Sequence, residues 1–159
     1  MLNIRPATTD DVTKILWFIR QLAIYEKAEH EVHASEDQIH SALFGHDAHC
    51  GSLIAEVDGE AVGFALYFFN FSTWLGKPGL YLEDLFVMPE SRGQGAGKAL
   101  LKALAKIAVD RGCGRFEWSV LDWNTPAIDF YQSLGAEPQS EWIIYRTHGE
   151  ALNRLAKTD

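Results

Sequence analysis

The chain has 159 residues, of which 47% are hydrophobic and 23% are charged; this composition is that of a one-domain globular protein and excludes a disordered or fibrous chain. Its formal net charge of -8 argues against a nucleic-acid partner and is compatible with a cationic substrate. No segment has the apolar length of a membrane span, and the first residues lack the pattern of a signal peptide, so we expect no membrane association and a cytoplasmic location.

Hydrophobic spacing and turn residues divide the chain into short elements. Apolar residues recur every three or four positions after cap residues at 8–11, which predicts a helix, whereas Asp58 and Gly59 separate two β-rich runs and predict a tight hairpin. Ser35 is expected to cap a second helix and Gly112 to end a third. The predicted elements are, in order, strand 2–7, helix 12–26, helix 35–44, strands 52–57 and 60–71, strand 79–88, helix 98–111, strand 115–121, helix 124–134, strand 142–147 and a short helix or tail at 149–157.

The order of these elements predicts the fold class. Strands come first as a meander and later alternate with helices, which favours an α/β (α+β) fold with one mixed sheet and helices on both faces, in a single domain over 1–159. Cys50 and Cys113 lack metal or redox spacing and are expected to be free thiols. The six histidines show no ligand spacing either, so we expect no metal.

A glycine-rich turn follows strand 79–88 and leads directly into the next helix. Backbone N–H groups at the start of a helix have no partners within it and lie at the positive end of the helix dipole, which suits a phosphate or pyrophosphate group. Glycines leave room for that group to approach the backbone. The turn therefore predicts an anion site made of Arg92, Gly93, Gln94, Gly95, Ala96, Gly97 and Lys98.

Two familiar phosphate-binding loops do not fit this turn. A Walker A loop requires glycine at the position of Arg92 and Ser or Thr at the position of Ala99. The dinucleotide-binding fingerprint requires a third glycine where the chain has Lys98. A phosphate-loop nucleotide enzyme is therefore a disfavoured alternative.

The pattern R-x-x-G-x-G, placed after a strand and opening a helix, resembles that of the GNAT superfamily of N-acetyltransferases. The blocks RPATTDD, LAIYEKAE, STWLGK, YLEDLFVMPESRGQGAG, DRGCGRF, VLDWN and FYQSLGA resemble the diamine acetyltransferase family, and especially its thialysine N-epsilon-acetyltransferase branch. They extend from Arg5 to Ala136 and so cover almost the whole chain. The resemblance implies a mostly antiparallel sheet, acetyl-CoA as the donor with its pyrophosphate on the glycine turn, a small primary amine as the acceptor, and a homodimer.

Two adjacent carboxylates interrupt the apolar strand that precedes the turn. An amine attacks a thioester only as its free base, and a nearby general base can remove the proton. Glu83 and Asp84 would be costly in an apolar strand unless they face a polar cleft or have partners. Successive strand residues point to opposite faces, so the two cannot share one role unless a bulge intervenes. The resemblance implies that Glu83 relays the amine proton through water and that Asp84 positions the acceptor; a structural role for each is the alternative.

Further donor-side residues follow from the resemblance. Tyr131 matches the family tyrosine beside the CoA sulfur, where a phenol can protonate the leaving thiolate, although packing on the sheet is the alternative. Backbone N–H groups of the splayed strand at Leu85, Phe86 and Val87 are expected to stabilise the oxyanion.

The start of the helix that carries this tyrosine is also expected to border the coenzyme. Asn124 precedes the helix and is expected to cap it, and Pro126 lies in its first turn. In the family this segment, with Ala127, lies along the CoA arm.

The acceptor cleft of the family is lined by two other blocks. Tyr25 and Glu26 end the first helix, and Trp74 follows a strand. A cation gains from a carboxylate and an aromatic face, so Glu26 and Trp74 are candidate ammonium contacts. A solvated glutamate and a half-buried tryptophan are the alternatives.

Three positions favour the thialysine branch over the polyamine branch. The polyamine-preferring branch has an acidic residue at the position of Ser72 and basic residues at those of Gln132 and Ser133. Fewer carboxylates make a long polycation a poorer acceptor, so thialysine or a lysine-like amino acid is expected, with polyamines and diamines as the alternative. A catalytically silent acyl-CoA-binding module is an alternative from another class.

Overall fold

The computed structural model describes residues 1–157 and contains two compact units, which begin at Met1 and at Asp122. None of the helices in residues 1–157 has the length and apolar character needed to cross a lipid bilayer. The elements of the first unit are β1 (Leu2–Pro6), η1 (Thr9–Asp11), α1 (Val12–Tyr25), η2 (Glu29–Glu31), α2 (Glu36–Phe44), β2 (Cys50–Val57), β3 (Glu60–Ser72), β4 (Lys77–Val87), η3 (Pro89–Ser91), α3 (Ala96–Asp110) and β5 (Arg115–Trp118).

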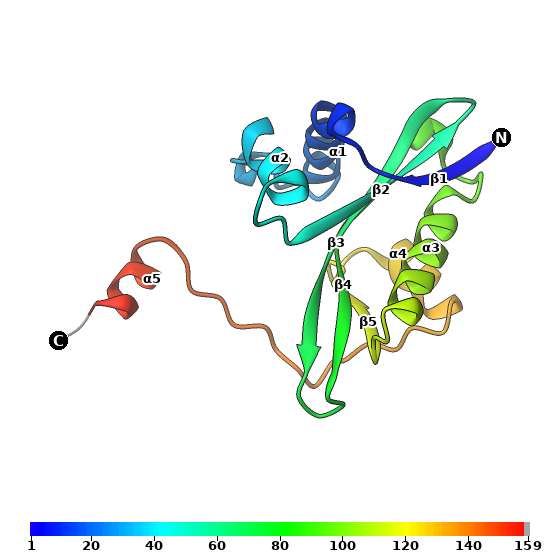
Figure 1. The fold of residues 1–159 in the computed structure, drawn as a ribbon. Coiled ribbons are helices and arrows are strands. Elements are labelled where there is room, and N and C mark those ends of the chain that lie inside the picture. Colours follow the sequence, from blue (N-terminus) through cyan, green and yellow to red (C-terminus); the bar gives the residue numbers. More distant parts are fainter. Residues whose placement is uncertain (158–159) are drawn as a thin grey trace. The chain divides into compact units, whose positions relative to one another are not determined.

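Within residues 1–121, five strands form one mixed sheet in the order β1-β2-β3-β4-β5 (Figure 1). The pairs from β1 to β4 are antiparallel, and β5 lies parallel to β4. The crossover from β4 to β5 runs through α3, as a parallel connection requires. The predicted mixed, mostly antiparallel sheet is therefore confirmed.

The two faces of this sheet are covered by different helices. Phe18 of α1 stacks on Phe64 of β3 at 5.5 Å between ring centroids, in a cluster that also contains Leu43 of α2. Side chains that pair across neighbouring strands share a face, so Leu80 and Leu82 belong to the opposite face, where α3 packs. Helices on both faces were predicted, and this prediction is confirmed.

Local signals correctly placed most boundaries in the first unit. Asp58 and Gly59 form the hairpin turn with φ values of 51° and 85°, in the left-handed region that an Asp-Gly turn adopts. The Ser35 hydroxyl oxygen accepts a hydrogen bond from the N–H of Gln38, and the Gln38 Oε1 accepts one from the N–H of Ser35, so α2 begins with a capping box. Helix α3 begins at Ala96, two residues before its predicted start.

Strand β5 is shorter than predicted. It ends at Trp118, whose partner in β4 is Leu82, and residues 119–121 are not part of the strand. The parallel ladder therefore stops immediately before Glu83. Beyond that point, no strand of the first unit pairs with the outer edge of β4.

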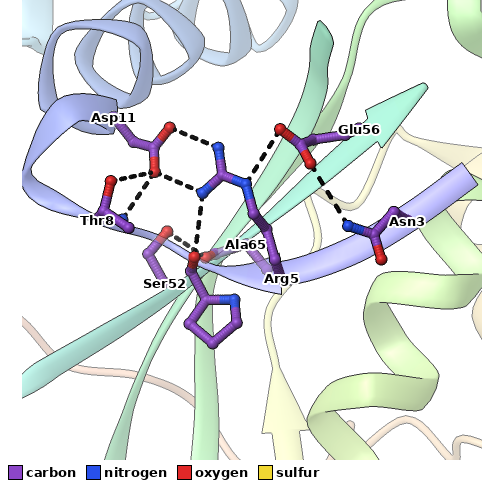
Figure 2. A network of polar contacts seen from close by, with 8 residues as sticks. Asn3, Arg5, Thr8, Asp11, Ser52, Glu56 and Ala65 are labelled. Atoms are coloured by element: carbon purple, nitrogen blue, oxygen red, sulfur yellow. Dashed lines mark hydrogen bonds and ion pairs between the residues drawn. The ribbon is translucent and has the colours of Figure 1, made fainter. Parts of the chain in front are cut away.

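An ion-pair network fastens the first strand to the first helix and to β2 (Figure 2). The guanidinium of Arg5 donates two hydrogen bonds to the Asp11 carboxylate, at 2.7 and 2.9 Å, and lies 3.1 Å from Glu56. The same carboxylate accepts a 2.7 Å hydrogen bond from the N–H of Thr8, which fixes the entrance to α1. The hydrogen bonds from Arg5 hold the pKa of the Asp11 carboxyl below its usual value, although the burial of this side chain acts in the opposite direction.

The second unit contains α4 (Thr125–Ser133) and α5 (Gly149–Ala156), both of which were predicted. The predicted strand at 142–147 is wrong, because these residues form neither strand nor helix. A strand needs a partner for its backbone groups, and the described part of this unit has no other strand. Pattern alone favoured a strand because the segment is rich in β-branched and aromatic residues.

Candidate active site

A β-bulge brings the two strand carboxylates to one face of the sheet. Leu66 of β3 pairs with Asp84, whereas the next residue, Tyr67, pairs with Leu82, so Glu83 is an extra residue without a partner in β3. The extra residue breaks the alternation of side chains, and both Glu83 and Asp84 fall on the face that carries α1. The sequence allowed the two carboxylates to share one role only if a bulge intervened, and the structure contains this bulge.

A third carboxylate, that of Glu26 at the C-terminal end of α1, lies close enough to these two to affect the ionisation of Asp84. Burial, with the charges of Glu83 and Glu26, raises the pKa of Asp84 to about 7. Burial also raises the pKa of Glu26, which is half-buried at the end of α1, whereas Glu83 is exposed. We call Glu26, Glu83 and Asp84 the acidic cluster. A cation placed there would relieve the mutual repulsion of these carboxylates.

The acidic cluster is not arranged as a metal site. Among residues 1–157, no group of three or more His, Cys, Asp or Glu side chains could hold a metal ion. An ammonium group, which binds carboxylates through hydrogen bonds without fixed coordination geometry, suits such a cluster.

Asp84 should make the protein less stable as the pH rises. In the unfolded chain its carboxyl ionises near pH 4, but in the folded chain it holds the proton until about pH 7, so stability falls with increasing pH across that interval. We expect Asp84→Asn to raise the free energy of unfolding by about 2–4 kcal/mol at pH 8 and to change it little at pH 4. Urea unfolding at pH 4 and pH 8 measures this change in the free energy of unfolding. An equal effect of Asp84→Asn at the two pH values would contradict the raised pKa of Asp84.

Cys50 is a neighbour of the acidic cluster that sequence reasoning missed. Burial and the charge of Glu83 raise the pKa of its thiol. Both cysteines are free, as predicted. Nothing local in the sequence places Cys50 near Glu83, because their proximity depends on the pairing of β2, β3 and β4.

The glycine turn has the backbone that an anion site requires. Gly93 and Gly95 have φ values of 83° and 86°, and Gly95 stands directly before the first residue of α3. A Cβ at either position would meet no atom within 4 Å, so glycine is needed there for its backbone torsions, while the surrounding space stays open. Gln94 and Lys98 are exposed beside them. The first N–H groups of α3 therefore face an open turn.

The end of β4 supplies backbone donors next to this turn. Leu85, Phe86 and Val87 pair with β3 on one side, and within the first unit no strand covers their other side. Phe86 is buried against Phe18 and Phe64, so its role is packing in addition to any backbone contact. Open strand edges of this kind offer N–H groups to a ligand.

Trp74 is not brought to the acidic cluster. It is 85% exposed in the turn between β3 and β4. Glu83 lies six residues beyond Lys77, the first residue of β4, so about 20 Å of strand separates the turn from the bulge. Its predicted contact with the acceptor stays a prediction. Tyr25, in contrast, is the last residue of α1, next to Glu26.

The remaining predicted residues belong to the second unit. Pro126 lies in the first turn of α4, as predicted, followed by Ala127, and Tyr131 lies in the same helix. Asn124 is the N-cap residue of α4, as predicted, but its side chain makes no capping hydrogen bond. With φ -85° and ψ 67°, its backbone is not in the extended conformation of a capping residue.

Comparisons with known proteins agree with this arrangement. The acetyltransferase (GNAT) family profile matches residues 10–136. A thialysine N-epsilon-acetyltransferase from Mus musculus is 41% identical over 97% of this chain and 96% of its own length. An L-ornithine N5-acetyltransferase from Arabidopsis thaliana is 34% identical over 98% of this chain and 88% of its own length. The solved structure of an integron cassette protein from the mobile metagenome of V. cholerae has a TM-score of 0.80 at 31% identity, covering 99% of this chain and 98% of that chain.

The similarity covers both the sheet and the glycine turn, so the structural likeness and the sequence likeness concern the same residues. The resemblance stated from the motifs is confirmed at the level of the family, as is acetyl-CoA as the donor. The chain belongs to the acetyltransferase (GNAT) family and is an acetyl-CoA-dependent N-acetyltransferase.

Proposed function

We propose that this enzyme transfers the acetyl group of acetyl-CoA to the side-chain amine of thialysine or a lysine-like amino acid. The observation that carries the proposal is the bulge at Glu83, which places two carboxylates on one face beside a third from α1. The name of the mouse relative supports thialysine, and so does the absence of an acidic side chain at Ser72.

In this proposal the acidic cluster binds the ammonium and removes its proton. Reaching the free base of a lysine-like amine at neutral pH costs about 4.6 kcal/mol, which a general base can offset. Glu83, the exposed member, takes the proton through a water molecule. Asp84 and Glu26, which are less exposed, hold the acceptor in place.

The donor side is proposed to use backbone groups and one phenol. N–H groups at the start of α3 bind the pyrophosphate of acetyl-CoA, with the torsions that Gly93 and Gly95 permit. Backbone N–H groups at the end of β4 stabilise the oxyanion formed when the amine attacks the thioester carbonyl. As the C–S bond breaks, Tyr131 gives its proton to the departing thiolate.

We propose that both units belong to one acetyltransferase domain. The family match over 10–136 crosses the boundary between the units at Asp122, which supports a single domain over 1–159. A homodimer and a cytoplasmic location stay predictions.

A diamine or polyamine acceptor is the second candidate. The cluster of three carboxylates favours any acceptor that carries more than one positive charge. The Arabidopsis relative is named for ornithine, an amino acid with one methylene fewer than lysine.

An acceptor panel with acetyl-CoA tests the proposal. Initial rates are compared for thialysine, lysine, ornithine, putrescine, spermidine and arylalkylamines, with CoA release as the readout. We expect the highest kcat/KM for thialysine, whose thioether makes the amine less basic and so supplies more free base. A preference for spermidine would replace this proposal by the polyamine alternative, and no turnover with any amine would point to a silent acyl-CoA-binding module.

A further inference from the structure

The side chain of Arg92, the first residue of the glycine turn, folds back onto the first unit. Its Nε donates a 2.9 Å hydrogen bond to the carbonyl oxygen of Val87, at the end of β4. Its guanidinium carbon lies 5.5 Å from the ring centroid of Tyr25 and 5.6 Å from that of Phe86. The cation therefore contacts the last residue of α1 and the end of β4 together.

These contacts fix the peptide from which the turn leaves the sheet. The carbonyl oxygen of Val87 accepts from Arg92, and the N–H of the same peptide, on Met88, donates a 2.8 Å bond to Val62 in β3. The N–H of Arg92 itself donates to the carbonyl of Pro89 at 3.2 Å. Arg92 thus closes the short η3 turn through both its main chain and its side chain.

We infer that Arg92 is a positioning residue that joins the coenzyme turn to the acceptor side, acting through Val87 and Tyr25 and not as a ligand of the pyrophosphate. The sequence predicted a direct coenzyme contact for this residue. The hydrogen bond to Val87 engages the Nε, and the guanidinium carbon lies over the two rings, so contacts within the first unit fix where this exposed side chain lies. Tyr25 is followed by Glu26 of the acidic cluster, and Arg92 itself belongs to the glycine turn. A shift of the Arg92 side chain would therefore affect the binding of both the amine and acetyl-CoA. Only the part of the inference that concerns the acceptor rests on the proposed function.

Three variants separate positioning from phosphate binding. Arg92→Gln removes the charge and the ring contacts, whereas Arg92→Lys keeps a charge that could meet a phosphate but loses the Nε hydrogen bond and the guanidinium over the two rings. Lys102→Gln, on the exposed face of α3, removes one positive charge without such contacts and serves as the control. Thermal unfolding of each variant verifies that it folds.

We expect both Arg92 variants to lose about tenfold in kcat/KM for the amine, with lysine giving no rescue. The affinity for CoA, measured by calorimetry without any acceptor, should be similar in the Arg92→Gln and Arg92→Lys variants. If Arg92 binds the pyrophosphate, the Arg92→Gln variant should bind CoA more weakly, whereas the Arg92→Lys variant should keep the affinity for CoA. The KM for the acceptor should then be unchanged in both variants. That pattern would overturn the inference and leave the proposed function intact, because the proposed function is tested separately, by the acceptor panel with the unaltered enzyme.

A double-mutant cycle with Tyr25→Leu gives an independent readout. If Arg92 acts through Tyr25, the double variant with Arg92→Gln should be little worse in kcat/KM than the poorer single variant. Losses that simply multiply would show that the two residues act separately and would contradict the coupling.

Discussion

Replacing Glu83 by glutamine is expected to lower kcat for amine acetylation about 100-fold near neutral pH. The amide has nearly the shape of the carboxylate but cannot accept the proton that must leave the ammonium before attack. The loss should shrink as the pH approaches the pKa of the amine, because solvent then supplies the free base. Steady-state kinetics across pH, with saturating acetyl-CoA, measures this dependence.

Glu60→Gln is the matched control for this change. Glu60 is an exposed glutamate at the start of β3, outside the acidic cluster, so the same substitution should leave kcat unchanged. A loss in Glu83→Gln of equal size at every pH would assign Glu83 to substrate placement, and no loss would remove it from the mechanism altogether.

Replacing Asp11 by asparagine is expected to lower the free energy of unfolding by about 3 kcal/mol near neutral pH. The substitution leaves Arg5 without the carboxylate that accepts its two short hydrogen bonds, in a buried position at the start of α1. Because the folded chain lowers the pKa of Asp11, its contribution is full above the unfolded pKa near 4 and is lost as the pH falls through the folded pKa. The difference between variant and unaltered chain should therefore shrink in acid.

Asp10→Asn is the comparison for that experiment. Asp10 precedes Asp11 in the same 3-10 turn but is exposed, so its replacement should change stability by no more than about 0.5 kcal/mol. Denaturant unfolding of both variants at several pH values is the measurement. Equal effects of the two substitutions would show that the Arg5 network does not stabilise the fold.

Features encoded by neighbouring residues were predictable from the sequence. Asp58 and Gly59 adopt positive φ values for local steric reasons, and Ser35 with Gln38 forms a capping box within four residues. Gly93 and Gly95 likewise have the torsions that only glycine adopts freely. The hairpin, the second helix and the glycine turn were therefore predicted in their correct places.

Features that depend on the register of distant residues were not predictable. The bulge arises from how β3 pairs with β4, and the raised pKa of Asp84 depends on α1 bringing Glu26 to the sheet. The direction of Arg92 could not be foreseen either, because a motif specifies residue types and not where a long side chain turns. The segment 142–147 shows the reverse error, a local preference for strand without a partner in its own unit.

The bulge also determines what the sheet requires of the residue that forms it. Leu82 and Asp84 pair with consecutive residues of β3 and lie on opposite faces of the sheet. Deletion of Glu83 alone would therefore keep all the remaining side chains of β4 on their present faces. The proposed base is thus an insertion that the sheet can lose without reversing its two surfaces. The alternation of the strand therefore places no constraint on which side chain stands at this one position.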